Sequence, residues 1–564
     1  MIAKAKKHLK QGTLMKAIFI KIFSLFKEPS AIVTMFPLKS TKNNMLYFGE
    51  NISSYSNQEY YPFIYQEKKH VYRSKDWNLP KVEIIRGQKT SRVRINGIVD
   101  EKFVLPIGVK EPSTELKIQI DEKNIDVSEF TPNRVIYLPF DGKSDISISS
   151  NKSVIMGDIL LLEQKKKTKY KLVLQLFVDG FGAQAFNSDD EFRNIMPNTY
   201  SFFNDGIKCS KCYSNGEWTL PSSAAIMTGN YTSHHGLYHD SKAHYINEKT
   251  KLVSEYFKEA GYFTFAITGN WRQSPLYGYY KGFDRMLYRS CVDIGMDIHE
   301  VIKNFKEQIL AFPERSTYAF LSLFELHNVF YGILSDLSCQ IKNPIHSKSM
   351  NSKLDGVSVF SEKNNIALEV YHNELQRIDF YLKELYDFIL EKYSKDEFLI
   401  NIVSDHGQSF FSNANQVLDR KRTNVMMLMR GKGVPKEEIL DIVENVDILP
   451  TILELCEIEY EKEEFDGINI FGQAKGKRKK YLYSESIFPG QTYKACLRDE
   501  THEYFFECKE ILGENLIIDV NNSFVEAYTL EGDLVVIDSA KEKCIKYEIE
   551  NHIEKSNILK KMNS

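Results

Sequence analysis

Three apolar runs of the sequence end in side chains that can bind a metal ion or move a proton. The endings are Asp179 after residues 172–178, Asp405 and His406 after 398–404, and Glu325 with His327 after 317–324. In open α/β sheets, sites form beyond the carboxyl ends of the strands. One such ending is common because aspartate suits turns. Three of them together predict a metal or acid–base site at one sheet edge.

The side chains at this edge are carboxylates and imidazoles. Such a mixed oxygen and nitrogen ligand set suits zinc, manganese or magnesium, and it suits calcium less well because of the imidazole. We therefore expect a divalent metal ion of one of the first three kinds.

A fourth element, residues 216–229, contains a hydroxyl at the start of a predicted helix. Pro221 has the φ favoured in a first helical turn, which places Thr219 at or just before the helix N-terminus. The free backbone N–H groups and the dipole there stabilise an anion. A metal ion can lower the pKa of such a hydroxyl and make it a nucleophile. Alternatively, Thr219 is only a helix cap.

The elements that must position these residues follow an alternating pattern. The runs at 172–178, 262–268, 317–324 and 398–404 are continuous and apolar, as in strands buried on both faces. Residues 371–393 carry apolar side chains every three or four positions, which predicts a helix. The fold class is therefore α/β, with a largely parallel sheet flanked by helices.

The flanking regions differ in pattern from this core. Short alternating runs between residues 77 and 155 predict a small antiparallel β domain. The predicted division is a basic amphipathic helical segment at 1–35, a β-rich accessory domain at 36–165, a catalytic domain at 170–490 and an α/β extension of it at 491–564.

The first segment places Leu14, Ile18, Ile22 and Leu25 on one helical face beside many lysines. It predicts either a helix on an anionic membrane surface or one docked on its own protein. No apolar run reaches the roughly 18–20 residues of a membrane span. We expect a cytoplasmic protein, either free or peripheral at the inner face of the membrane.

Charge and cysteine usage restrict the function further. The formal net charge is −3, so nothing in the overall composition attracts nucleic acid. Cys209 and Cys212 form a C-x-x-C pair, but no second pair completes a zinc site. Two reduced thiols are the expected state.

Taken in order, these segments resemble the sulfatase-like branch of the alkaline phosphatase superfamily over about residues 170–490. The matching pieces are V-D-G-F-G at 178–182, M-P-N at 196–198, T-L-P-S-S at 219–223, T-G-N-Y-T at 228–232, the stretch 260–271, K-G-F-D-R at 281–285, S-D-H-G at 404–407, and 446–455 with 465–470. The resemblance implies an enzyme with an alkaline phosphatase-like fold.

The sequence departs from sulfatases at four positions of the resemblance. Thr219 stands where sulfatases carry a cysteine or serine that becomes formylglycine, and threonine cannot become that aldehyde. Ser223 replaces an arginine, Gly180 the second aspartate and Asn270 a lysine. A threonine with a single first-turn carboxylate instead resembles the phosphoethanolamine and phosphoglycerol transferases and the nucleotide phosphodiesterases.

By position, the resemblance implies that Asp179, Thr219, Asp405 and His406 hold one metal ion. It makes Thr219 and His327 the catalytic residues, with His327 facing the substrate. Asn270, His235 and Arg420 are candidate substrate-binding residues. Lys421 and Arg422 could likewise neutralise an anion.

Three functions remain open. The first is a hydrolase or transferase of phosphoesters that acts through Thr219 on a glycan, a lipid-linked or a small phosphoester. The second is a sulfuric ester hydrolase. The third is an inactive binding protein, which the joint presence of the four ligands disfavours.

Overall fold

The computed structural model describes residues 33–34, 46–47, 60–64, 81–96, 101–239, 245–247, 249–289, 296–329, 336–347, 363–411, 416–471, 479–488 and 490–562. The predicted helical segment at 1–35 lies outside the described residues apart from Val33–Thr34, which form strand β1. Strand β2 (Leu46–Tyr47) pairs with β1.

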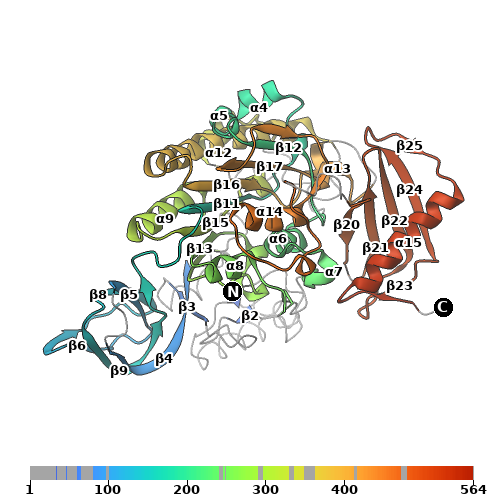
Figure 1. Ribbon diagram of the computed structural model, residues 1–564. Helices are drawn as coiled ribbons and strands as arrows, with labels where there is room; N and C mark the ends of the chain where they lie inside the picture. The colour runs from blue at the N-terminus through green and yellow to red at the C-terminus, as the bar shows by residue number, and fades with distance from the viewer. Residues whose placement is uncertain are drawn as a thin grey trace, which may run out of the picture.

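A parallel sheet forms the centre of the molecule (Figure 1). Its parallel strands lie in the order β14 (Arg285–Tyr288), β13 (Phe263–Thr268), β15 (Thr317–Leu323), β11 (Leu172–Val178) and β16 (Phe398–Val403). Beyond β16, the antiparallel β17 (Asn424–Gly431) pairs with β12 (Ile207–Tyr213), and β12 pairs with the short β18 (Glu437–Ile439) and β19 (Val443–Glu444). The predicted α/β class with a largely parallel sheet is confirmed.

Helices cover both faces of this sheet. One face packs against α4 (Asp189–Ile195), α5 (Pro197–Phe203), α9 (Ile298–Ala311) and α12 (Asn365–Lys392). The other packs against α6 (Thr219–Thr228), α8 (Val253–Glu259) and α14 (Ile448–Leu455). Strand β11 sends Leu174 and Leu176 into the first core and Val173 and Phe177 into the second. This explains why its sequence is apolar throughout rather than alternating.

The predicted β-rich region is an antiparallel domain joined to the central sheet by one long strand. The first half of β4 (Val82–Asn96) pairs with β14 and with β3 (Tyr60–Ile64), and its second half pairs with β9 (Asp145–Gly157). Strands β5 (Phe103–Val109), β6 (Leu116–Ile120), β7 (Lys123–Val127), β8 (Arg134–Phe140) and β10 (Leu160–Leu161) complete the domain.

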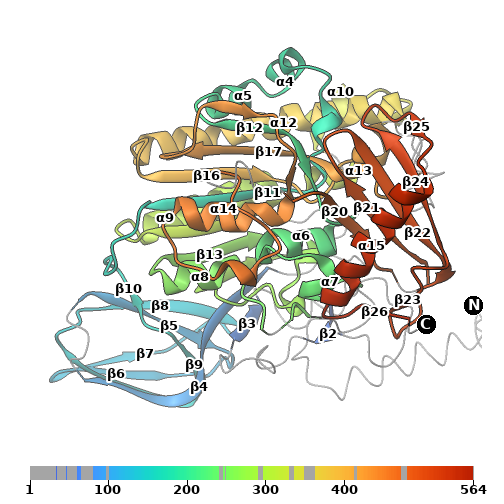
Figure 2. The ribbon, with the colours of Figure 1, turned by 45° about the vertical axis from the view of Figure 1, so that its right-hand side comes forward.

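A second antiparallel sheet lies at the other end of the molecule (Figure 2). Its order is β20 (Leu482–Ser486), β21 (Thr492–Arg498), β22 (His502–Ile511), β24 (Ser523–Thr529) and β25 (Leu534–Val535). Helix α15 (Ser539–Lys555) packs on it through Ile545, Ile549 and Ile553. A short ladder joins β23 (Ile517–Ile518) to β26 (Lys560–Lys561). The predicted boundary at 490/491 falls inside this sheet.

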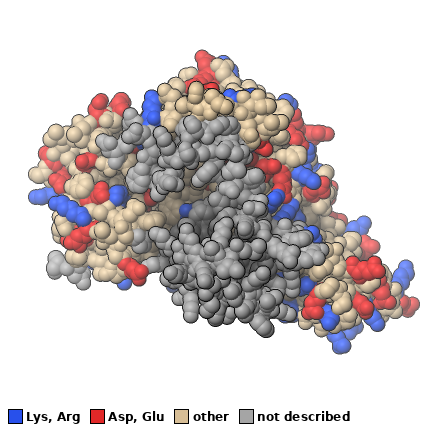
Figure 3. All heavy atoms as spheres, turned by 180° about the vertical axis from the view of Figure 1, so that it is seen from behind, with Lys and Arg blue, Asp and Glu red and all other residues tan. Residues whose placement is uncertain are grey.

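In the described part of the chain, neither the charge distribution nor the cysteines of the C-x-x-C pair indicate a further function. On the face shown in Figure 3, basic and acidic side chains are interspersed. No described helix is long and apolar enough to cross a bilayer. Cys209 and Cys212 are free, buried thiols on β12, and burial raises the pKa of Cys209 to about 12.

A buried ion pair ties the β-rich domain to the central sheet. Glu83 on β4 is 1% exposed and pairs with Arg285 on β14, while Tyr137 on β8 donates to Glu83 at 2.7 Å and accepts from Arg285 at 3.0 Å. The three side chains come from three strands, so the cluster fixes how the two sheets meet.

Arg285→Ala should therefore destabilise the protein by about 3–5 kcal/mol, because it leaves the Glu83 carboxylate buried without its partner. Denaturant unfolding would measure the loss. Lys383→Ala is the control, since Lys383 pairs with Asp387 at 56% and 60% exposure and such surface pairs contribute only about 0.3–0.5 kcal/mol. Equal effects of the two substitutions would contradict this role of the cluster.

Candidate metal centre

Asp179 is the residue that ends the central strand β11. It is fully buried, and its backbone N–H donates to Leu323 O on the neighbouring β15 at 2.9 Å. Its Oδ2 atom accepts from Asn270 Nδ2 at 2.6 Å. Asn270 follows β13 and was predicted to contact substrate; here its amide orients the carboxylate of Asp179.

Asp405 and His406 end the adjacent strand β16. Asp405 Oδ1 accepts the backbone N–H of Gly180 at 3.0 Å, and Ser404 Oγ accepts that of Phe181 at 2.8 Å. These two bonds tie the ends of β11 and β16 together. His406 Nδ1 donates to Gly407 O at 2.8 Å, so Nε2 carries the lone pair. Nε2 lies 3.4 Å from Asp405 Oδ2 and 3.7 Å from Asp179 Oδ1.

Thr219 meets these residues from the start of α6. Its hydroxyl lies 3.3 Å from Asp179 Oδ2 and 3.2 Å from His406 Nε2. Trp218, the residue before it, is the N-cap and makes no side-chain cap bond. The Thr219 side chain is therefore directed to the carboxylates and not to its own helix, which argues against a simple cap.

The unpaired atoms of this cluster fit a divalent cation. Among the described residues, Asp179 Oδ1 and Asp405 Oδ2 are buried and have no hydrogen-bond partner. Two unpaired carboxylate oxygens and an imidazole lone pair within a few ångströms of one another are a ligand set for zinc, manganese or magnesium. Thus Asp179, Asp405, His406 and Thr219, the four predicted ligands, converge on one place.

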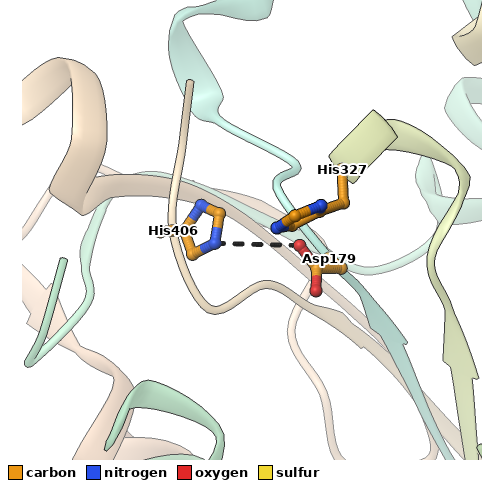
Figure 4. A group of neighbouring side chains, drawn as sticks. All are labelled: Asp179, His327 and His406. Carbon is orange, nitrogen blue, oxygen red and sulfur yellow. Dashed lines mark ion pairs between the residues drawn. The ribbon is translucent and has the colours of Figure 1, made fainter. Parts of the chain in front are cut away.

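His327 joins them from the short helix η4 (Glu325–Asn328). One ring nitrogen of His327, a carboxylate oxygen of Asp179 and a ring nitrogen of His406 all lie within 4.8 Å of one another. Figure 4 shows the three side chains pointing toward one another. The sequence predicted a substrate-facing histidine here; the structure also makes His327 a possible further ligand.

The electrostatics of the cluster follow from burial. Loss of solvent, and then the nearby charge of Asp405, raise the pKa of Asp179 well above its usual range. Burial lowers the pKa of His406, and so does the charge of Arg422. Without a cation in the site, the neutral forms of both Asp179 and His406 are therefore favoured.

Glu325 is the strand-end acid that does not take part. Its Oε1 atom accepts the N–H of Ile298 at 2.6 Å and its Oε2 atom that of Phe324 at 2.9 Å. Burial raises the pKa of Glu325 to about 7. Both of its oxygens are used by backbone donors, one of them at the start of α9, so this strand end contributes His327 to the cluster and not Glu325.

Gly180 stands where the resemblance expects a second sulfatase aspartate, and the side chain of Gln408 lies beside it. The φ of Gly180 is +73°, and a Cβ atom there would meet Gln408 Nε2 at 2.3 Å. The Gln408 amide instead donates to Leu326 O at 3.1 Å. Gln408 thus occupies the space beside the turn. Only its position directly after the D-H-G motif could have indicated this role from the sequence.

The basic segment after the D-H-G motif divides between two places. The half-buried Arg420 lies toward the C-terminal sheet. Its Nη2 atom is so near Gly532 that a Cβ atom added to this glycine would lie 3.1 Å from it. Arg422 is 2% exposed and donates to Glu217 O, two residues before Thr219. Of the three basic residues predicted to neutralise an anion, all on helix α13 (Arg420–Thr423), Arg422 is therefore the one that reaches the Thr219 segment.

His235 is a buried residue of the short helix α7 (Thr232–His235). It is fully buried, and its Nδ1 atom accepts the N–H of Leu237 at 3.1 Å. Burial lowers its pKa to about 4. The structure does not bring it into the carboxylate cluster, and its contact with substrate stays a prediction.

A family model covers the part of the chain that holds this cluster. The family model described as Sulfatase matches residues 171–458, just over half of the chain. A search of curated proteins found no sequence match.

Solved structures show the same fold at low identity. A phosphonate monoester hydrolase from Silicibacter pomeroyi is 15% identical with a TM-score of 0.50, covering 68% of this chain and 96% of its own. A structure from Bacteroides thetaiotaomicron, described as a candidate sulfatase, is 14% identical with a TM-score of 0.51, covering 69% and 93%. Another, described under the metabolism of multiple glycosaminoglycans by that organism, is 14% identical with a TM-score of 0.50, covering 64% and 89%.

Asp405→Asn should weaken the binding of a divalent metal about tenfold or more, because it removes a charged ligand. Glu325→Gln is the matched control: it also alters a buried strand-end acid, but one bonded to backbone donors, and it should bind metal as the wild type does. Elemental analysis and metal titration would measure both. Equal metal content in Asp405→Asn and the wild type would refute the assignment.

Proposed function

The chain belongs to the sulfatase family, and on this basis we propose that it cleaves or transfers a phosphoester through a covalent intermediate on Thr219. One observation supports this most: the Thr219 hydroxyl lies between Asp179 Oδ2 and His406 Nε2, at 3.3 and 3.2 Å. The family is metal-dependent, and the fit of the cluster supports a single zinc, manganese or magnesium ion.

Asp179, Asp405 and His406, with Thr219 itself, would hold that ion. It would act as a Lewis acid that lowers the pKa of the hydroxyl and offsets charge on the transferring group. The chain's own residues supply the positioning. Asn270 fixes the Asp179 carboxylate, and the start of α6 holds the Thr219 oxygen in place. Such pre-organisation supplies much of the rate in phosphoryl transfer.

The reaction proceeds in two displacements. In the first, the Thr219 oxygen forms a bond to phosphorus and loses its proton to solvent, while the P–O bond to the leaving alcohol breaks and that alcohol takes a proton from solvent. In the second, water or an acceptor hydroxyl attacks phosphorus and loses its proton. The P–O bond to Thr219 then breaks, and the threonine hydroxyl regains a proton.

The residues that stand in place of the sulfatase residues favour a phosphoester over a sulfate ester as the substrate. A threonine cannot form the aldehyde that sulfatases use. Gln408 fills the place beside Gly180, and Ser223 Oγ accepts from Gln273 at 3.1 Å in an uncharged contact. The family match itself favours the second candidate, a sulfuric ester hydrolase.

The proposed substrate is a glycan or lipid-linked phosphoester. It is supported by the fold neighbour described under glycosaminoglycan metabolism and by the basic amphipathic pattern of residues 1–35. A cytoplasmic protein, peripheral at the inner face of the membrane, is part of the same proposal.

Thr219→Ala should lower turnover by several orders of magnitude, on the order of 10³-fold or more, because the nucleophile is lost. Thr219→Ser should keep part of the activity, because it retains the hydroxyl. Peptide mass spectrometry after acid trapping should show a phosphate adduct on Thr219 in the wild type. Wild-type turnover by Thr219→Ala would disprove the covalent route.

Side-by-side assays distinguish the two candidate reactions. We expect bis-p-nitrophenyl phosphate or p-nitrophenyl phosphate to be turned over faster than p-nitrophenyl sulfate. Thr232→Ala, which removes a buried threonine hydroxyl on α7, is a matched control for the Thr219 variants. A preference for the sulfate ester would favour the sulfuric ester hydrolase.

A further inference from the structure

Arg422 is a buried cation that forms no ion pair with any described residue. It is 2% exposed, and no carboxylate of a described residue lies within ion-pair distance of it. Its guanidinium donates to one backbone carbonyl, Glu217 O, and its Nε atom has no partner among the described residues. A guanidinium enclosed in this way is costly unless an anion completes its hydrogen bonds.

The position of Arg422 connects the two segments that build the metal centre. Its backbone oxygen accepts the N–H of Gly407 at 2.6 Å, which holds it beside the turn of Asp405 and His406. Its guanidinium reaches Glu217, two residues before Thr219. Arg422 therefore lies between the ligand turn and the nucleophile segment.

Nearby acids do not satisfy this cation. Glu217 Oε1 accepts from Ser486 Oγ at 2.7 Å, and its Oε2 atom is buried without a partner. Burial raises the pKa of Glu217 and lowers that of Arg422 to about 10. The opposite charges of the two side chains act against these shifts but do not outweigh burial.

We propose that Arg422 binds a non-bridging oxygen of the substrate's tetrahedral anion. The proposal rests on the proposed function for the position of the anion beside Thr219. Guanidinium groups suit this task because their planar N–H groups match phosphate and sulfate oxygens. Phosphate and sulfate share this chemistry, so both serve as probes.

Calorimetric titration of inorganic phosphate and of sulfate into the full-length, metal-loaded protein tests the proposal. Arg422→Ala should weaken binding of the preferred anion about 10- to 100-fold, because one charge-assisted contact is lost. Arg422→Lys should weaken it less. Whichever anion binds the wild type more tightly identifies the class of ester.

Arg430→Ala is the matched control. Arg430 is also buried, at 6% exposure, and donates to a backbone carbonyl, Phe202 O at 2.7 Å, but it lies on β17 where it faces Asp205. This variant should be destabilised and yet bind the anion as the wild type does. Arg422→Ala with affinity within twofold of the wild type would overturn the proposal.

Two further measurements exclude a purely structural explanation. The upward shift of the unfolding midpoint by phosphate should shrink in Arg422→Ala, even if that variant starts from a lower midpoint. Added guanidinium ion should restore part of its turnover. An undiminished phosphate shift, or no rescue by guanidinium, would count against anion contact by Arg422.

Anion binding can be separated from covalent catalysis by repeating the titration in Thr219→Ala. If Arg422 still controls phosphate affinity there, the anion site stands whether or not Thr219 is the nucleophile. If Thr219→Ala turns over substrate normally while Arg422→Ala loses affinity, only the covalent route has failed.

Discussion

The structure depends on two carboxylates that are buried side by side at the edge of the central sheet. Asp179 and Asp405 are both fully buried, and each keeps one oxygen without a partner among the described residues. Two desolvated negative charges this close repel each other, and the raised pKa of Asp179 expresses that cost. A divalent cation bound between them would offset this cost.

The surrounding strands and helices position these two aspartates and bring further functional side chains next to them. Parallel strands β11 and β16 bring the two aspartates together, because adjacent parallel strands end at the same edge. The N–H of Gly180 is bonded to Asp405, so the two strand ends are held in register. Helix α6 then adds the Thr219 hydroxyl, and α13 adds Arg422 from a segment that follows the ligand turn.

Much of the centre could be predicted from the sequence, because strand burial is visible as uninterrupted apolar runs. The convergence of Asp179, Asp405, His406 and Thr219 follows from that signal and from the order of the motifs. Side-chain direction does not follow from it. Glu325 occupies a similar strand end, yet two backbone donors engage its carboxylate, and one of them is the first residue of α9. Likewise, only the geometry of a four-residue helix decides whether Arg420 or Arg422 faces the site.

The central claim is that this cluster is a one-metal centre. Anomalous diffraction from crystals soaked with zinc or manganese and a phosphate analogue tests it most directly. We predict a single strong peak about 2.0–2.2 Å from oxygens of Asp179 and Asp405 and from His406 Nε2. No peak at these residues, or a peak held by other side chains, would contradict the account.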